Sequence, residues 1–126
     1  MKLKTLLSIN AIIALGYGIC FVLVPKTVLS VYGMTDNPSA MLAGQFFGDA
    51  LIALGLLTWL ARNVSDPETR KAFILALLIS DVVGLIVSVQ GTLSEVMSAV
   101  GWSAVGIYLF LALGFAYFQF MNPSDS

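Results

Sequence analysis

The sequence predicts an all-α integral membrane protein, a bundle of four transmembrane helices, and two observations lead to this class. Of its 126 residues 59% are hydrophobic and only 10% are charged, with a mean hydropathy of +0.95, whereas soluble domains carry about 25% charged residues. Four apolar stretches each reach the roughly 20 helical residues that cross a bilayer. They cover residues 5–24, 39–61, 69–90 and 95–120. We therefore expect one four-span domain over 1–126.

The first stretch follows Lys2 and Lys4 and ends before Pro25. Its apolar run of about 20 residues exceeds the roughly 7 to 15 apolar residues of a secretory signal, so we expect a retained helix. Residues 26–32 mix apolar and polar side chains and stop at Gly33. That pattern is typical of a short helix lying in the membrane interface between the first two spans.

Capping residues mark the starts of the later spans. Asn37 and Pro38 suit the cap and first residue of the second span. The third is preceded by Ser65 and Glu68, and the fourth by Thr92 and Glu95, both pairs at capping-box spacing. Asn122 and Pro123 are expected to end the last helix.

Basic residues predict the orientation of the chain. One side of the predicted bundle carries only Lys26, and the other carries Lys2, Lys4, Arg62, Arg70 and Lys71. Because cytoplasmic loops are enriched in Lys and Arg, the second side is predicted to be cytoplasmic. Both termini are then expected in the cytoplasm.

Asp49 and Asp81 are the candidate functional residues because each lies near the middle of an apolar span that offers no basic partner. A carboxylate at the bilayer centre costs roughly 2.5 to 3.5 kcal/mol on insertion scales and marks a functional site by default. Tyr17 and Tyr108 lie at a similar depth in the first and fourth spans. We expect all four side chains to face the interior of the bundle.

Helical spacing assigns a face to each candidate, because positions three, four and seven apart share one side of a helix. Each span carries a stripe of small and polar residues, as membrane helix interfaces favour, so every stripe is predicted to point inward. The stripes are Asn10, Ala14 and Tyr17; Gln45 and Asp49 flanked by Gly44 and Gly48; Asp81, Gly84 and Ser88; and Gly101, Tyr108, Ala112, Phe115 and Gln119.

The polar residues are distributed unevenly between the two halves of the spans. Gln45 and Ser88 lie on the outer side of the aspartates, whereas the cytoplasmic half offers mainly Leu56, Leu57, Ile74, Leu77 and Phe115. The sequence therefore predicts a cavity that opens outward and is sealed on the cytoplasmic side.

Several function classes are disfavoured by composition. With a net charge of -1 and no basic run, the chain lacks the Lys and Arg surface of a nucleic-acid-binding protein. It has no histidine and a single cysteine, Cys20, so neither a protein-bound metal nor a cofactor is expected. Without histidine or an intramembrane lysine, the bases left for an enzyme are the two aspartates, which does not favour catalysis.

Two functional hypotheses from different classes follow. In the first, the Asp49 and Asp81 pair binds or transports a proton, a cation or a small polar ligand across the bilayer, with Gln45, Tyr17, Tyr108 and Ser88 around it. In the second, the chain is a non-catalytic accessory or structural subunit of a larger membrane complex, and the carboxyls only tie helices together. A homodimer is compatible with either hypothesis.

The segment Gly44-Gln-Phe-Phe-Gly-Asp-Ala-Leu-Ile-Ala-Leu-Gly-Leu-Leu, followed by Trp59 and Arg62, resembles small bacterial four-span families of unknown function, broadly like the DoxX-type proteins. The resemblance extends to helix number and length over most of the chain. It implies a multi-pass protein of the bacterial inner membrane. It transfers no site residues, and Asp49 departs from the small residue that would suit this position.

Overall fold

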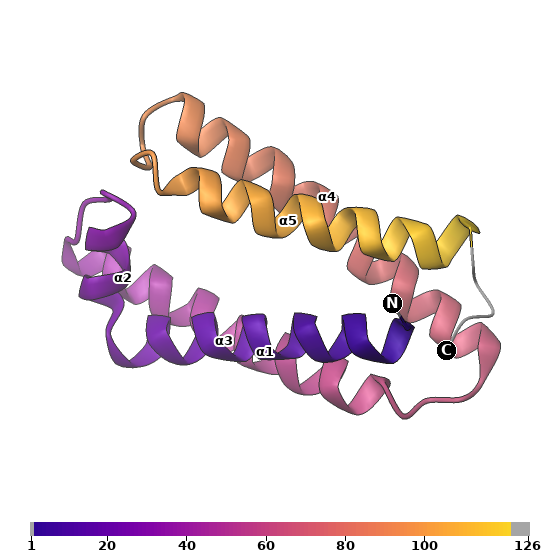
Figure 1. The fold of residues 1–126 in the computed structure, drawn as a ribbon. Coiled ribbons are helices and arrows are strands. Elements are labelled where there is room, and N and C mark those ends of the chain that lie inside the picture. Colours follow the sequence, from indigo (N-terminus) through magenta and orange to yellow (C-terminus); the bar gives the residue numbers. More distant parts are fainter. Residues whose placement is uncertain (1, 122–126) are drawn as a thin grey trace.

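A computed structural model describes residues 2–121, and every regular element in this range is a helix (Figure 1). The elements are α1 (Leu3–Leu23), α2 (Pro25–Val31), α3 (Pro38–Ala61), α4 (Pro67–Leu93), α5 (Gly101–Ala116) and the π-helical segment η1 (Tyr117–Met121). Four helices are long and apolar enough to cross a membrane, namely α1, α3, α4 and the continuous α5 and η1. The predicted all-α class with four apolar spans is confirmed.

The first two predicted boundaries are confirmed. The short helix expected at 26–32 is α2, and Gly33 follows it with a φ of 69°, a backbone conformation that favours glycine. The Asn37 side chain caps α3 by accepting a hydrogen bond of 2.8 Å from the backbone N–H of Ala40. These local signals therefore gave the correct start of the second span.

The two predicted capping boxes are wrong. Helix α4 is capped by Asp66, whose carboxylate accepts hydrogen bonds from the N–H and the hydroxyl of Thr69. Thr92 lies inside α4, where its hydroxyl donates to the carbonyl of Ser88 at 2.8 Å instead of capping a new helix. The chain then turns at Glu95, which has a φ of 64°.

These differences move two helix ends. The third span continues to Leu93 instead of 90, and the fourth begins at Gly101 instead of 95. The predicted end at Asn122 and Pro123 lies outside the described residues.

The long helices form two hairpins, α1 with α3 and α4 with α5 (Figure 1). Glycines allow close approach of α1 and α3, since a Cβ atom on Gly48 would lie 2.7 Å from the carbonyl oxygen of Gly18. In the other hairpin, Gly84 of α4 packs under the ring of Tyr108 of α5. Small residues therefore set the packing in both hairpins, as is usual between membrane helices.

One apolar cluster joins the two hairpins at the end of the bundle that carries Lys2, Lys4, Arg62, Arg70 and Lys71, which we call the basic end. We call these residues the basic-end cluster: Leu3, Leu6, Leu7, Ile74, Leu77, Leu111, Phe115 and Phe118. All are buried, and they come from α1, α4, α5 and η1. The hairpins are thus packed together where the polar stripes end.

The opposite end, which we call the α2 end, has a polar link between the hairpins. The backbone N–H of Ser98, in the turn between α4 and α5, donates to the carbonyl of Tyr32 at 2.8 Å. Tyr32 directly follows α2 and is itself buried. The short helix α2 therefore lies between the loop of one hairpin and the body of the other.

Candidate functional site

Asp81 is the buried carboxyl of the bundle. It lies on the inner face of α4 together with Leu77 and Ser88, and it is only 6% exposed. Its Oδ2 atom is buried without a hydrogen-bond partner among the described residues. Buried polar atoms are nearly always paired, so an unpaired one calls for an explanation. A bound proton or a bound ligand group would supply the missing partner of this oxygen.

Asn10 provides a second unpaired polar atom on α1. Its side chain is 3% exposed, and its Nδ2 is buried without an acceptor among the described residues. Asn10 follows Leu7 by three residues and Asp81 follows Leu77 by four, so both lie about one helical turn beyond the basic-end cluster. Both atoms lie on the α2 side of the basic-end cluster, and among the described residues two further unpaired polar atoms, Arg70 Nε and Gln119 Oε1, lie at the basic end.

Tyr108 extends this polar region toward the α2 end. Its ring lies on Gly84, the residue one turn after Asp81 on the same face of α4. Tyr108 is half-buried and lies within range of electrostatic interaction with Asp81 and with Tyr32. The Tyr108 phenol is thus close enough to interact with both the buried carboxyl and Tyr32, which belongs to a tyrosine pair.

Tyr17 and Tyr32 form that pair, with their hydroxyl oxygens 2.9 Å apart. Tyr17 comes from α1 and Tyr32 follows α2, so the contact depends on α2 folding back against α1. Both line an open cavity of about 560 Å³ between α1, α2 and the start of α5. The cavity lies toward the α2 end. It is not the cavity predicted around the aspartates, because neither Asp81 nor Gln45 lines it.

The remaining predicted candidates on α4 and α5 have local roles. Ser88 is buried, but its hydroxyl donates to the carbonyl of Leu85 at 3.0 Å and does not line the cavity. Gly101 packs against Thr92 and Met97.

Asp49 does not join Asp81, and the prediction that its stripe faces inward is wrong. Asp49 and Gln45 are both exposed on α3, and Gln45 donates to the carbonyl of Val22 at 3.1 Å. The buried face of α3 against α1 carries Gly44 and Gly48, and Gln45 reaches α1 only from the edge of that face. A rotation of about 100° per residue then turns Asp49 past α1 toward the outside of the bundle.

The predicted seal is correct for one hairpin and wrong for the other. Ile74, Leu77 and Phe115 belong to the basic-end cluster, as expected. Leu56 and Leu57 are exposed, because α3 instead directs Leu54 toward the cluster.

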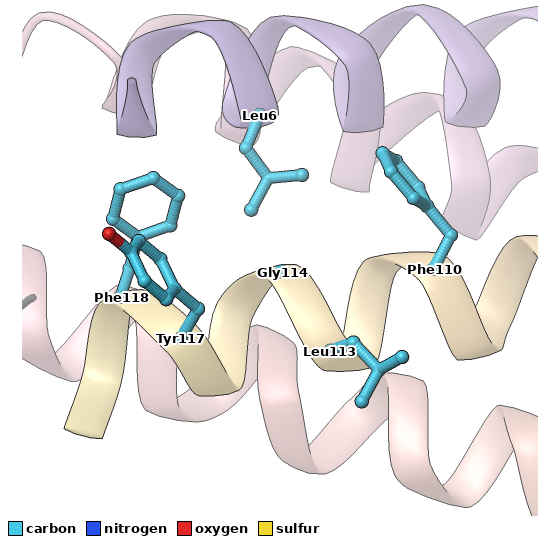
Figure 2. A pocket seen from close by; sticks show the side chains of 6 residues that line it. All are labelled: Leu6, Phe110, Leu113, Gly114, Tyr117 and Phe118. Atoms are coloured by element: carbon cyan, nitrogen blue, oxygen red, sulfur yellow. The ribbon is translucent and has the colours of Figure 1, made fainter. Parts of the chain in front are cut away.

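A second hollow lies beside the basic-end cluster and is almost entirely apolar. Figure 2 shows Leu6 of α1 pointing toward Gly114 of α5, with Phe110 and Phe118 on either side. This groove has a volume of about 310 Å³. Among its lining residues only Tyr117 carries a side-chain hydroxyl, and neither Asp81 nor Asn10 lines it.

Two residues of the site escaped the sequence prediction. Asn10 lies on the inner stripe with Tyr17, and its amide in an apolar span is itself a sequence signal for a buried polar site. The sequence places Tyr32 only in the interfacial helix. Its contact with Tyr17 joins positions 15 residues apart. The sequence predicts the break at Pro25 and the short helix after it, but not the direction in which that helix packs.

The Asp81 carboxyl can hold a proton or accept a ligand group at its unpaired Oδ2. Among residues 2–121, no group of three or more His, Cys, Asp or Glu side chains is placed to hold a metal ion. No family model, curated protein or solved structure matches the chain. Function is therefore inferred from the side chains around Asp81.

Proposed function

We propose that this chain is a multi-pass protein of the bacterial inner membrane, similar in type to the DoxX-like families, that binds a proton, a small cation or a small polar group at Asp81. The observation that carries the proposal is the buried Oδ2 of Asp81, which has no partner within the described chain. Carboxyls inside membrane helices face protein or water and mark ion or proton pathways. In this proposal Asp81 alone binds the proton or ligand, whereas the sequence predicted a site formed by Asp49 and Asp81 together.

Access to Asp81 is proposed from the α2 end. The basic-end cluster packs the hairpins together on one side of this residue, whereas Tyr108 and the Tyr17 and Tyr32 pair lie on the other. The distribution of Lys and Arg predicts that the basic end is cytoplasmic. A proton or cation would then exchange with the outer side of the membrane.

Infrared spectroscopy of the protein in liposomes tests this proposal. A pH titration should reveal the carbonyl band of a protonated carboxylic acid in apolar surroundings, because Asp81 is buried and unpaired. The band should be absent in Asp81→Asn and retained in Asp49→Asn, the matched control from α3. Identical spectra for native protein and Asp81→Asn would contradict the proposal.

A change of salt distinguishes the ligands. If Asp81 binds a small cation, replacing choline chloride with sodium chloride should move the titration midpoint of the band to lower pH, since cation and proton compete. A midpoint that does not depend on the salt indicates a proton site.

The exposed Asp49 favours a second candidate function, an accessory subunit that packs the outer face of α3 against a membrane partner. Lipid does not solvate a carboxyl, so a partner at this face would remove the cost of its exposure. The test is purification from native membranes in mild detergent. The accessory function predicts that Asp49→Leu loses a co-purifying protein that Asp81→Asn retains, and the binding function predicts no such difference.

A further inference from the structure

We propose that the open cavity at the α2 end binds a lipophilic molecule whose hydrogen-bond acceptor oxygen meets the Tyr17 and Tyr32 hydroxyls. This cavity shares Tyr17 and Tyr32 with the access side proposed for Asp81, but neither Asp81 nor Asn10 lines it. The proposal rests on the size and lining of the cavity and on the hydrogen bonding of the two tyrosines.

The lining determines the main chemical class of the ligand. The walls are mostly aliphatic, with Ile12 and Ile13 from α1, Val28 and Val31 from α2, and Val100 directly before α5. The volume of about 560 Å³ lies within the roughly 300 to 1,000 Å³ of small-molecule sites. An apolar molecule matches these walls, whereas a compact hydrophilic solute would lose hydrogen bonds to water without gaining any from them.

The tyrosine pair determines the polar group of the ligand. Two phenols carry two O–H donors, and the contact of 2.9 Å between their oxygens uses one of them. The structure gives these hydroxyls no other partner within residues 2–121. One O–H therefore remains available at the cavity wall, and a ligand oxygen such as a carbonyl would accept it.

The position of the cavity fits a ligand that enters from the membrane interface. Cys20 lies three residues before the end of α1, and Thr27 and Val28 lie on the short helix that follows. An amphipathic molecule concentrates at this depth, where its apolar body and its polar group both find suitable surroundings. The native Cys20 thiol is exposed and lines the cavity, so it can report on occupancy.

The test measures how fast N-ethylmaleimide modifies Cys20 in the full chain in liposomes, with either 9-fluorenone or fluorene added. These probes have nearly the same shape and differ in one carbonyl group. Fluorenone should protect Cys20 at a concentration about two- to tenfold lower than fluorene, which is the range that one net hydrogen bond supplies. The double variant Tyr17→Phe with Tyr32→Phe should bind both probes equally.

A control separates the cavity from general partition into the bilayer. In a Cys20→Ala background, Ala53→Cys places the thiol on the exposed side of α3, where neither probe should slow the modification. Equal protection of Cys20 by both probes in the native chain, or protection by neither, would overturn the proposal. So would a fluorenone preference that persists in the double phenylalanine variant.

Discussion

The two hairpins place their intramembrane aspartates on opposite sides, one inside the bundle and one outside. Each carries one aspartate near the middle of a transmembrane helix, yet Asp81 is buried on α4 and Asp49 is exposed on α3. In α3, Gly44 and Gly48 occupy the contact face and leave the neighbouring carboxyl outside. In α4, Asp81 shares its face with Gly84, so close packing draws the carboxyl inward. In each helix the glycine face packs against the neighbouring helix, so the aspartate is buried only where it shares that face.

The largest expected contrast comes from replacing each aspartate with leucine. In an insertion assay, either change should favour insertion of its own helix by about 3 kcal/mol, because Asp is costly and Leu favourable at the bilayer centre. The assembled proteins should differ. Asp49→Leu should leave the unfolding free energy nearly unchanged. Asp81→Leu should change it by about 1 to 3 kcal/mol, because it removes a buried unpaired polar group and adds volume to a packed face.

The measurement for the assembled proteins is unfolding in mixed micelles with increasing denaturing detergent. Equal changes in unfolding free energy for Asp49→Leu and Asp81→Leu would mean that the two carboxyls have similar surroundings. That result would remove the distinction between the hairpins.

Gly48→Ala tests the backbone contact of the first hairpin. The added Cβ would lie 2.7 Å from the carbonyl oxygen of Gly18 and 2.8 Å from the Cβ of Phe21, so we expect a loss of about 2 kcal/mol in unfolding free energy. Gly106→Ala is the matched control, because no atom lies within 4 Å of a Cβ placed there. It should be neutral or raise stability by up to about 1 kcal/mol. Similar losses at both positions would contradict the α1 and α3 packing.

Gly84→Ala makes the corresponding test in the second hairpin. The new methyl group would overlap the ring of Tyr108, and we expect a loss of about 1 to 2 kcal/mol in unfolding free energy. A double-mutant cycle supplies the check. In a Tyr108→Ala background the same substitution should cost much less, since the ring is gone, and an unchanged cost would place Tyr108 elsewhere.

Local signals explain which parts of the fold the sequence predicts well. Apolar length identifies all four spans, and Asn37 with Pro38 marks the start of α3. The inner faces of α1 and α4 follow from Asn10 and Asp81, both buried as expected. In these helices the polar residues and the small residues lie on one stripe, so packing and polarity give the same answer.

The errors come from positions where two signals compete. On α3, Gly48 and Asp49 are adjacent and cannot both face α1, and the sequence gives no measure of which one wins. Thr92 and Glu95 match a capping box, but the Thr92 hydroxyl bonds within α4. The Tyr17 and Tyr32 contact depends on the path of the chain through α2, which is a tertiary feature.

The smallest expected effect concerns the cap of α4, outside the membrane. The hydroxyl and the N–H of Thr69 hold the pKa of Asp66 below its usual value of about 3.9. A carboxyl with a lowered pKa in the folded state stabilises the fold above its unfolded pKa and loses that contribution as pH falls through the folded pKa. Asp66→Asn retains a capping oxygen but cannot titrate, so its stability should vary less between pH 5 and pH 2, roughly the range over which a lowered Asp titrates.

Circular dichroism of thermal unfolding at a series of acidic pH values measures this difference. We expect the native protein to lose slightly more stability than Asp66→Asn on acidification. Parallel curves for the two proteins would show that the Asp66 cap does not contribute to the acid sensitivity of the fold.

The opposite placement of the two aspartates is tested most directly by nitroxide spin labels at position 49 or 81, in a Cys20→Ala background in liposomes. Collision with molecular oxygen, which concentrates in lipid, reports exposure to acyl chains. The structure predicts strong broadening by oxygen for the label at 49 and weak broadening by oxygen at 81. Strong broadening at 81, or a protected label at 49, would contradict the account of a buried Asp81 site.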